Sequence, residues 1–428
     1  MPAYNRFMAD ALSTELSRGV LSAADLRQRL HVSPATLMRA VREARAEVIA
    51  IGRGRATRYG LRQTWATLQT SRFPVFRILH TGTARSEGDL FTLAARQTVW
   101  MPGGNVASGL PIELADARPS GFLGRHFAAM HPDLRLPTRL MEWSDHHILL
   151  AMSRRGEDVP GNLVVGDESF ARWQALDVPL RTRADYPRLA DATTAGHPPG
   201  SSAGGERPKF GAFADGRHVL VKFAARGGPG DVAARRWCDL LVLEALALSV
   251  VSARGLLAAQ TEIIETDSHC FLESERFDRV GIKGRLAVLS LAAVQDDPAD
   301  PWARVAALLR DAGRLSSEDA RHLQWLDAFG AHIGNTDRHP YNVIFFADGA
   351  TLRLAPAYDH VSMFYAPTAD GQVPPRAFAP PHVTADTLAV WDDARAAARE
   401  FWQRASDDAR VANDVRALSA ANARALAH

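Results

Sequence analysis

Three side chains with oxygen donors, Asp337, Asn342 and Asp359, are spaced in a way that suits magnesium-dependent phosphoryl transfer. Asp337 lies five residues before Asn342, and Asp359 lies seventeen residues after it. In protein kinases an Asp at this spacing orients the attacking hydroxyl, while the Asn and a later Asp hold the metal. Magnesium prefers hard oxygen ligands and takes few of them from the protein. The spacing predicts Asp337 as the catalytic residue and Asn342 and Asp359 as magnesium ligands.

The flanking segments predict that these residues lie in a loop on a rigid frame. Before the loop, four apolar side chains at helical spacing predict a buried helix: Leu323, Leu326, Phe329 and Ile333. The helix is expected to end near Gly334. Residues 343–346 and 351–354 predict two strands joined by an Asp-Gly hairpin turn, with Asn342 and Asp359 at the same end. Each residue alone also fits a helix cap, a turn or a solvated acid, but the combined arrangement favours a site.

Residues further upstream suit the phosphates of a nucleotide. Residues 201–209 are rich in Ser and Gly, so backbone N–H groups around Gly204 and Gly205 could approach phosphate oxygens, and Lys209 adds a positive charge. The strand that follows places Lys222 where a kinase strand lysine contacts the α and β phosphates. Alone, the Gly-rich stretch equally fits a disordered connector. The strand with Lys222 that follows favours the phosphate-binding interpretation.

A long apolar helix that carries Glu244 is predicted over residues 237–251. In a kinase fold an acid on this helix pairs with the strand lysine, here Lys222. The alternative is a partly exposed helix acid, and the sequence leaves both open.

The stretch between about residues 201 and 359 resembles the HipA family of bacterial serine/threonine kinase toxins, and within it the members with their own N-terminal DNA-binding domain. Four motifs occur in the family's order: the Ser-Gly loop of 201–209, Lys222, Glu275-Arg276-Phe277-Asp278-Arg279, and the Asp337 to Asn342 loop with Asp359. The resemblance implies an α+β, two-lobed protein-kinase-like fold that uses ATP and Mg²⁺.

Other roles follow from the resemblance alone. The backbone from Glu275 to Phe277 would contact the adenine, His339 would face the nucleotide, and Ser202 would be a regulatory, autophosphorylated serine. Where the family's loop carries Gln, this chain has Arg207. Family substrates are aminoacyl-tRNA synthetases or translation factors, and the usual partner is a separate antitoxin.

The first 62 residues differ from the rest in charge. Eleven Arg and no Lys stand against five acids there, so this part has a net charge of +6 and the remainder −4, for a total of +2. Phe7 and Leu12 are expected on the inward face of a first helix, and Ser22 and Ser33 to start the next two. Residues 48–61 predict a strand, a basic glycine turn and a strand. This is the outline of a winged helix-turn-helix.

Five arginines on this outline are available to DNA: Arg39, Arg42 and Arg45 on the third predicted helix, and Arg53 and Arg55 on the glycine turn. Arginine binds phosphate and reads guanine edges with paired hydrogen bonds, so a recognition helix and a wing are predicted. The alternative is a helical docking module whose arginines are merely solvated. The predominance of Arg over Lys favours DNA.

The remaining composition is that of an ordinary globular protein, with 46% apolar and 23% charged residues. Cys238 and Cys270 have no C-x-x-C spacing, so neither a disulfide framework nor a structural zinc site is expected. No stretch is apolar enough for a membrane span, and no signal peptide is recognisable. A cytoplasmic location and no membrane partner are therefore expected.

We predict three parts: a winged helix-turn-helix over 1–62, a mixed β/α kinase lobe over 63–275, and a mainly helical lobe with the catalytic loop and metal site over 276–428. The middle region is expected to be mainly strands with some helix. Its histidines, such as His146 and His147, lack ligand spacing and are expected to be structural or surface histidines.

The function that fits these patterns is an ATP- and magnesium-dependent serine/threonine protein kinase, acting on a translation-related protein and on itself, with a DNA-binding domain in cis for autoregulation. One alternative is a DNA-binding transcription regulator whose kinase fold only senses nucleotide. Another is a small-molecule phosphotransferase. The intact Asp337, Asn342, Asp359 and Lys222 argue against the first alternative, and the 275–279 motif argues against the second.

Overall fold

The computed structural model describes residues 2–119, 121–195, 207–228 and 230–427. Its contacts divide the chain into two compact units. The first comprises Met1–Leu79, Ala84–Ser120 and Gly124–Leu176, and the second comprises His80–Thr83, Gly121–Leu123 and Asp177–His428. No described helix is long and apolar enough to cross a membrane. The three predicted domain ranges stay a prediction.

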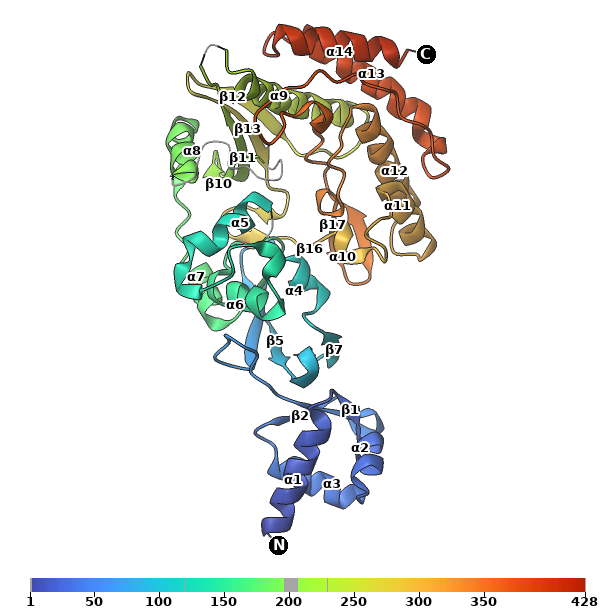
Figure 1. The fold of residues 1–428 in the computed structure, drawn as a ribbon. Helices are drawn as coiled ribbons and strands as arrows, with labels where there is room; N and C mark the ends of the chain where they lie inside the picture. Colours follow the sequence, from blue (N-terminus) through green and yellow to red (C-terminus); the bar gives the residue numbers. More distant parts are fainter. Residues whose placement is uncertain (1, 120, 196–206, 229, 428) are drawn as a thin grey trace. The chain divides into compact units, whose positions relative to one another are not determined.

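The first unit begins with three helices and a small antiparallel sheet, drawn in blue in Figure 1. These elements are α1 (Pro2–Leu16), α2 (Ala23–Leu30), α3 (Pro34–Glu43) and, in sheet order, β1 (Leu21–Ser22), β3 (Arg58–Leu61) and β2 (Val48–Ile51). Ser22 and Ser33 cap α2 and α3 by accepting hydrogen bonds from backbone N–H groups, which confirms the two predicted helix starts. Leu12, Leu26 and Leu37 pack into one core.

Two predictions for this segment are wrong. Phe7 is 67% exposed, because the neighbouring Met8 takes the buried position on α1 instead. Arg45 is not on the third helix: α3 ends at Glu43, and Arg45 lies exposed in the turn that leads into β2.

The rest of the first unit is an antiparallel five-stranded sheet with helices against it. The strands, in sheet order, are β7 (Asn105–Ser108), β6 (Gln97–Met101), β5 (Ala84–Thr92), β4 (Arg72–Ile78) and β8 (Leu163–Val165). The helices are α4 (Ile112–Asp116), α5 (Gly121–Met130), α6 (Asp145–Arg155) and α7 (Asp167–Gln174). Apolar side chains of α6 and of β4 share one core.

The second unit contains a sheet between two helices. In sheet order its strands are β12 (Thr261–Glu265), β13 (His269–Glu275), β11 (Arg217–Ala225), β10 (Lys209–Ala214) and β9 (Leu180–Arg181). Successive strand residues face opposite ways. On β13, Cys270 and Leu272 therefore pack against α9 (Val232–Ala253), whereas Phe271 packs against α8 (Tyr186–Thr194). Figure 1 shows α9 running alongside these strands.

The C-terminal part of this unit is mainly helical. Its helices are α10 (Leu291–Val294), α11 (Trp302–Asp311), α12 (Ser317–His332), α13 (Trp391–Asp407) and α14 (Asn413–Ala425). Its strands are β14 (Arg279–Val280), β15 (Gly284–Arg285), β16 (Val288–Ser290), β17 (Ile344–Asp348) and β18 (Thr351–Leu354). The helix predicted before the catalytic loop and the hairpin predicted after it are confirmed as α12 and β17–β18. One core joins α9, α12 and α13.

Candidate active site

The site centres on Lys222, which lies between two carboxylates. Its Nζ lies 2.7 and 2.9 Å from the two oxygens of Glu244 on α9, and 2.6 Å from Oδ1 of Asp359. The sequence left two roles open for Glu244, and the structure decides for the ion pair. The geometry follows from strand alternation, because Lys222 faces the same side of β11 as the residues that pack against α9.

Burial makes the charges in this cluster matter. Burial favours neutral groups and raises the pKa of Glu244. Burial also raises the pKa of Asp359, but the charges of Lys222 and Lys209 outweigh it and hold this pKa at about 2. For Lys222, burial lowers the pKa, and the attraction of Asp359 and Glu244 more than reverses this. The lysine and Asp359 are therefore both ionised at neutral pH.

Lys209 belongs to the same cluster. It lies directly opposite Lys222 in the β10–β11 ladder, so both side chains project from the same face of the sheet. Its charge lowers the pKa values of Asp359 and Glu244. Two lysines thus face the buried Glu244 and the partly buried Asp359, which is a suitable place for the negative charge of phosphates.

The catalytic loop brings three predicted residues together. Asn342 Nδ2 donates to the backbone oxygen of Asp337 at 2.8 Å, and His339 Nε2 lies 4.0 Å from Asp337 Oδ1. Asn342 is buried, whereas Asp337 and His339 are about half exposed, at 48% and 43% of their side-chain surface. The carboxylate of Asp337 can therefore meet a substrate, while Asn342 is held inside.

Two residues that sequence reasoning missed hold this loop. Arg338 Nε donates to Asp327 Oδ1 at 3.0 Å, and its Nη1 donates to the backbone oxygen of Asn335. Asp327 is 8% exposed on α12, and its other oxygen accepts from the N–H of Ala303. The sequence pattern that could have identified Asp327 is its position four residues after Leu323, which places this acid on the buried face of the helix.

Asp359 is positioned from both sides of the site. The segment before it forms a parallel bridge between Ala357 and Ala258, which lies in the connection from α9 to β12. The Tyr358 hydroxyl donates to the backbone oxygen of Tyr341, next to Asn342. Asp359 itself has φ +57°, a left-handed conformation that is uncommon for a non-glycine residue and frequent at functional sites.

The donor atoms fit a magnesium ion. Because the amide nitrogen of Asn342 donates to Asp337, its Oδ1 is left as an acceptor. Asp359 keeps Oδ2 beyond the oxygen that Lys222 contacts. The described residues contain no cluster of three His, Cys, Asp or Glu that could hold a metal. Two protein oxygens match the small number that Mg²⁺ takes when phosphates and water supply the rest.

Of the three backbone N–H groups predicted to be available to adenine, from Glu275 to Phe277, two already donate hydrogen bonds within the protein. The N–H of Glu275 donates to the oxygen of Gln260, and that of Arg276 donates to the oxygen of His218. An adenine at this position would need another backbone group, such as the Phe277 N–H. The Phe277 ring packs 5.7 Å from that of Tyr358, beside the Asp359 segment.

Part of the predicted phosphate loop, with Ser202, Gly204 and Gly205, lies outside the described residues. The described end of the loop begins at Arg207. Its guanidinium stacks 3.7 Å from the centre of the Trp237 ring on α9. Burial lowers the pKa of Arg207 to about 10. This contact ties the base of the loop to the helix that carries Glu244.

Comparisons with known proteins match this geometry. Residues 201–427 match the HipA-like C-terminal domain, and residues 69–174 match the YjjJ-like toxin middle domain. Toxin YjjJ of Escherichia coli (strain K12) is 33% identical, over 95% of this chain and 95% of that protein. The chain belongs to the YjjJ-like toxins of the HipA family. The resemblance predicted from the motifs is thereby confirmed.

A solved structure shows the same HipA-like kinase fold. It is HipA of Shewanella oneidensis MR-1, solved as a complex of HipA, HipB and operator DNA. It covers 82% of this chain and 95% of its own, with a TM-score of 0.50 and 15% sequence identity. At this identity the likeness establishes the mixed α+β fold. For a YjjJ-like toxin, membership of a kinase family also implies the use of ATP.

The five arginines predicted to meet DNA all lie in the first unit and are exposed: Arg39, Arg42, Arg45, Arg53 and Arg55. Among the described residues, no ion pair joins any of them to a carboxylate. The turn that carries the last two contains Gly52 at φ +81° and Gly54 at φ +62°, which only glycine adopts readily.

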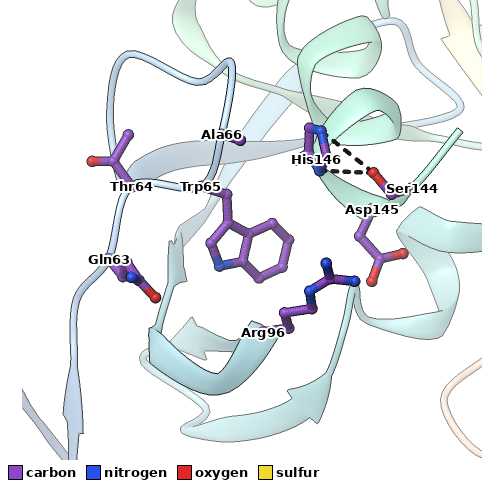
Figure 2. A pocket seen from close by; sticks show the side chains of 8 residues that line it. All are labelled: Gln63, Thr64, Trp65, Ala66, Arg96, Ser144, Asp145 and His146. Carbon is purple, nitrogen blue, oxygen red and sulfur yellow. Dashed lines mark hydrogen bonds between the residues drawn. The ribbon is translucent and has the colours of Figure 1, made fainter. Parts of the chain in front are cut away.

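The first unit also has a cavity of about 220 Å³ that the sequence did not predict (Figure 2). Trp65, Arg96, Asp145 and His146 line it. The Ser144 hydroxyl and His146 Nδ1 lie 2.7 Å apart, while His147 Nδ1 accepts from the Ser144 N–H and so helps to cap α6. This capping contact gives His147 a structural role, one of the two that the sequence allowed. None of the predicted phosphoryl-transfer residues lines the cavity.

Proposed function

We propose that this protein is an ATP- and magnesium-dependent serine/threonine protein kinase that modifies a translation-related protein and itself. The observation that supports this most strongly is the assembly of Lys222, Glu244 and Asp359 from three separate segments, with all contacts at 2.6–2.9 Å. Burying these charged groups costs free energy of desolvation, so their presence favours a functional role over a purely stabilising one. The cluster occurs beside a loop in which the Asp337 side chain is 48% exposed.

Each residue has a role in this proposal. Asp337 orients the substrate hydroxyl and accepts its proton, and Lys222 and Lys209 face the phosphates. Asn342 Oδ1 and the Asp359 carboxylate would hold the magnesium ion, which neutralises phosphate charge when bound. His339, whose Nε2 lies 4.0 Å from Asp337 Oδ1, would face the nucleotide.

The test is incubation of purified protein with magnesium and γ-labelled ATP, beside Asp337→Ala. Because the Asp337 side chain is half exposed, the variant should fold normally and lose labelling by at least about 100-fold. Peptide mapping should place the wild-type label on Ser202 or a neighbouring serine. Near-normal labelling of Asp337→Ala would refute the assignment.

We also propose that residues 1–62 are a winged helix-turn-helix that binds DNA in cis. The order of α1 to α3 and the β2–β3 hairpin support it, as do the five exposed arginines without carboxylate partners. A related HipA was solved with HipB and operator DNA, so DNA is a plausible ligand for a toxin of this family. Self-contained DNA binding would make a separate antitoxin dispensable for autoregulation.

A salt titration of the full-length protein on duplex DNA tests this second proposal. Replacing Arg53 and Arg55 together by Ala should reduce the slope of log affinity against log salt by roughly 2 if both contact phosphates. An unchanged slope would exclude the turn between β2 and β3 as a DNA contact.

The nucleotide-sensing regulator and the small-molecule phosphotransferase remain distinct outcomes of these tests. Bound ATP without labelling would support the first. Rapid turnover with a small hydroxyl compound, and none with protein, would support the second.

A further inference from the structure

The two cysteines, which are distant in sequence, meet in the second unit. Cys238 lies near the start of α9 and Cys270 on β13, and these are the chain's only cysteines. Cys238 Sγ lies 3.9 and 3.7 Å from the backbone oxygens of Ala224 and Ala225, and Ala224 is the direct ladder partner of Cys270. Cys270 belongs to a buried cluster with Ala224, Cys238 packs against the same cluster, and both are free thiols.

The two sulfurs differ in environment. Cys270 is 1% exposed, whereas Cys238 is only partly buried and can be reached from solvent. The neighbouring Cys270 and the charges of Arg226 and Arg207 lower the pKa of Cys238, whereas Cys238 and burial raise the pKa of Cys270. Reactive cysteines are typically partly exposed and near positive charge. Cys238 is thus suited to attack, and Cys270 to resolve the product.

We propose that Cys238 and Cys270 are a reversible oxidation site that forms a disulfide with hydrogen peroxide as oxidant. The Cys238 thiolate attacks one peroxide oxygen, the O–O bond breaks, and hydroxide leaves to give a sulfenic acid. The Cys270 sulfur then attacks the Cys238 sulfur, and the sulfenic oxygen leaves as water with the thiol proton. In total, two thiols and one peroxide give one disulfide and two waters.

The disulfide would act on the helix that carries Glu244. An S–S bond is about 2.05 Å long, shorter than any hydrogen-bonded contact between sulfurs, so the start of α9 must approach β13. Trp237, next to Cys238, holds Arg207 at the base of the predicted phosphate loop. Oxidation should therefore move this contact and lower phosphoryl transfer, an effect that rests on the proposed kinase function.

The site itself is tested without any kinase assay. Full-length protein is treated with peroxide, its free thiols are titrated, and its peptides are mapped by mass spectrometry. We expect loss of both thiols, a peptide linking Cys238 to Cys270, and full recovery with dithiothreitol. Cys270→Ser should instead carry sulfenic or sulfinic acid on Cys238, and Cys238→Ser should keep its remaining buried thiol.

Two results would overturn the site: both thiols surviving peroxide that oxidises a free cysteine peptide, or a disulfide only between two molecules. For the effect on α9, labelling with γ-labelled ATP should fall several-fold in the oxidised wild type and not in Cys238→Ser after the same treatment. Equal labelling of mapped oxidised and reduced protein would refute that effect. Absence of labelling in both states would instead contradict the kinase proposal and leave the disulfide standing.

Discussion

At the scale of single residues, the site consists of oppositely charged side chains that lie close together and are shielded from solvent. Lys222 is one cation between two carboxyl groups, and Lys209 adds a second positive charge across the ladder. The side chains of Lys222 and Glu244 are only 8% and 4% exposed. The close contact between such buried partners offsets the cost of removing them from water. Removal of one partner leaves the charge of the other uncompensated.

Replacement of Lys222 by Met should lower the free energy of unfolding by about 3–5 kcal/mol, the usual cost of breaking a buried pair. Glu244→Gln should cost less, because Lys222 keeps Asp359 as a partner. Urea unfolding measures both. The double variant is the control: it should regain part of the stability, since Glu244 no longer carries an unpaired charge, and yet remain unlabelled by ATP, because Asp359 still lacks Lys222. If Lys222→Met were as stable as the wild type, the charged pair would contribute nothing.

At the scale of elements, α12 both ends at the proposed catalytic loop and supports it. Gly334 follows the helix at φ +68° and turns the chain, and its oxygen accepts from the N–H of Phe364 beyond Asp359. Gly330, on the last turns of α12, leaves room for the Arg338 side chain that pairs with Asp327. The absence of a side chain at Gly330 is therefore a condition for the position of the loop.

Gly330→Ala tests this support. Alanine favours a helix over glycine by up to about 1 kcal/mol. Its Cβ would lie 2.9 Å from Arg338 Cδ, however, so the arginine must move. We expect unchanged or higher stability together with labelling reduced roughly 10- to 100-fold, as for small misplacements of catalytic groups. In a protein that already carries Arg338→Ala, adding Gly330→Ala should not reduce labelling further. A further reduction would show that Gly330→Ala acts through a contact other than Arg338.

Because of His332, the last residue of α12, we expect the stability of the protein to fall at acid pH. It is 1% exposed, and among the described residues neither ring nitrogen has a hydrogen-bond partner. Burial, with the charge of Arg395, lowers its pKa to about 4. The unfolded chain binds the proton near pH 6.5 but the folded chain only near pH 4, so stability falls as the pH drops through this window, by about 3 kcal/mol in total.

His332→Phe should remove this part of the acid sensitivity. The ring can still pack on Trp391, whose ring centre lies 4.4 Å from that of His332, and no hydrogen bond to a described residue is lost. The variant should match the wild type near pH 7 and exceed it near pH 4 in urea unfolding. His322→Phe, a change at a less buried position of the same helix, is the matched control. Parallel curves for wild type and His332→Phe would contradict the prediction.

At the scale of the whole molecule, the contacts separate two units with different chemistry. The exposed arginines lie in the first unit, and Lys222, Glu244, Asp337 and Asp359 all lie in the second. The functions proposed for the two units should therefore be separable by mutation.

Arg39→Ala combined with Arg42→Ala should weaken DNA binding and leave ATP labelling within about twofold of the wild type, as expected for surface changes that touch no core. Asp337→Ala should do the reverse. DNA binding and labelling are measured on the same full-length preparations. Loss of both activities in either variant would show that the two units depend on each other.

Much of the site was predictable because it depends on local spacing. The interval from Asp337 to Asn342, the apolar stripe of α12 and the Asp-Gly hairpin are short-range patterns, and all three elements occur as expected. The third helix was assigned too long, since helix ends are set by the turn that follows, and Phe7 was placed inward because the spacing did not distinguish it from Met8.

The sequence by itself determined the family, the loop with its oxygen donors and the strand lysine, since these are encoded in residue types a few positions apart. Only the tertiary structure decided that Glu244 pairs with Lys222, that Arg338 binds Asp327, and that Cys238 packs against the cluster that contains Cys270. Each of these contacts joins residues on different elements. Their distance depends on how helix and sheet faces pack, and no interval along the chain records it.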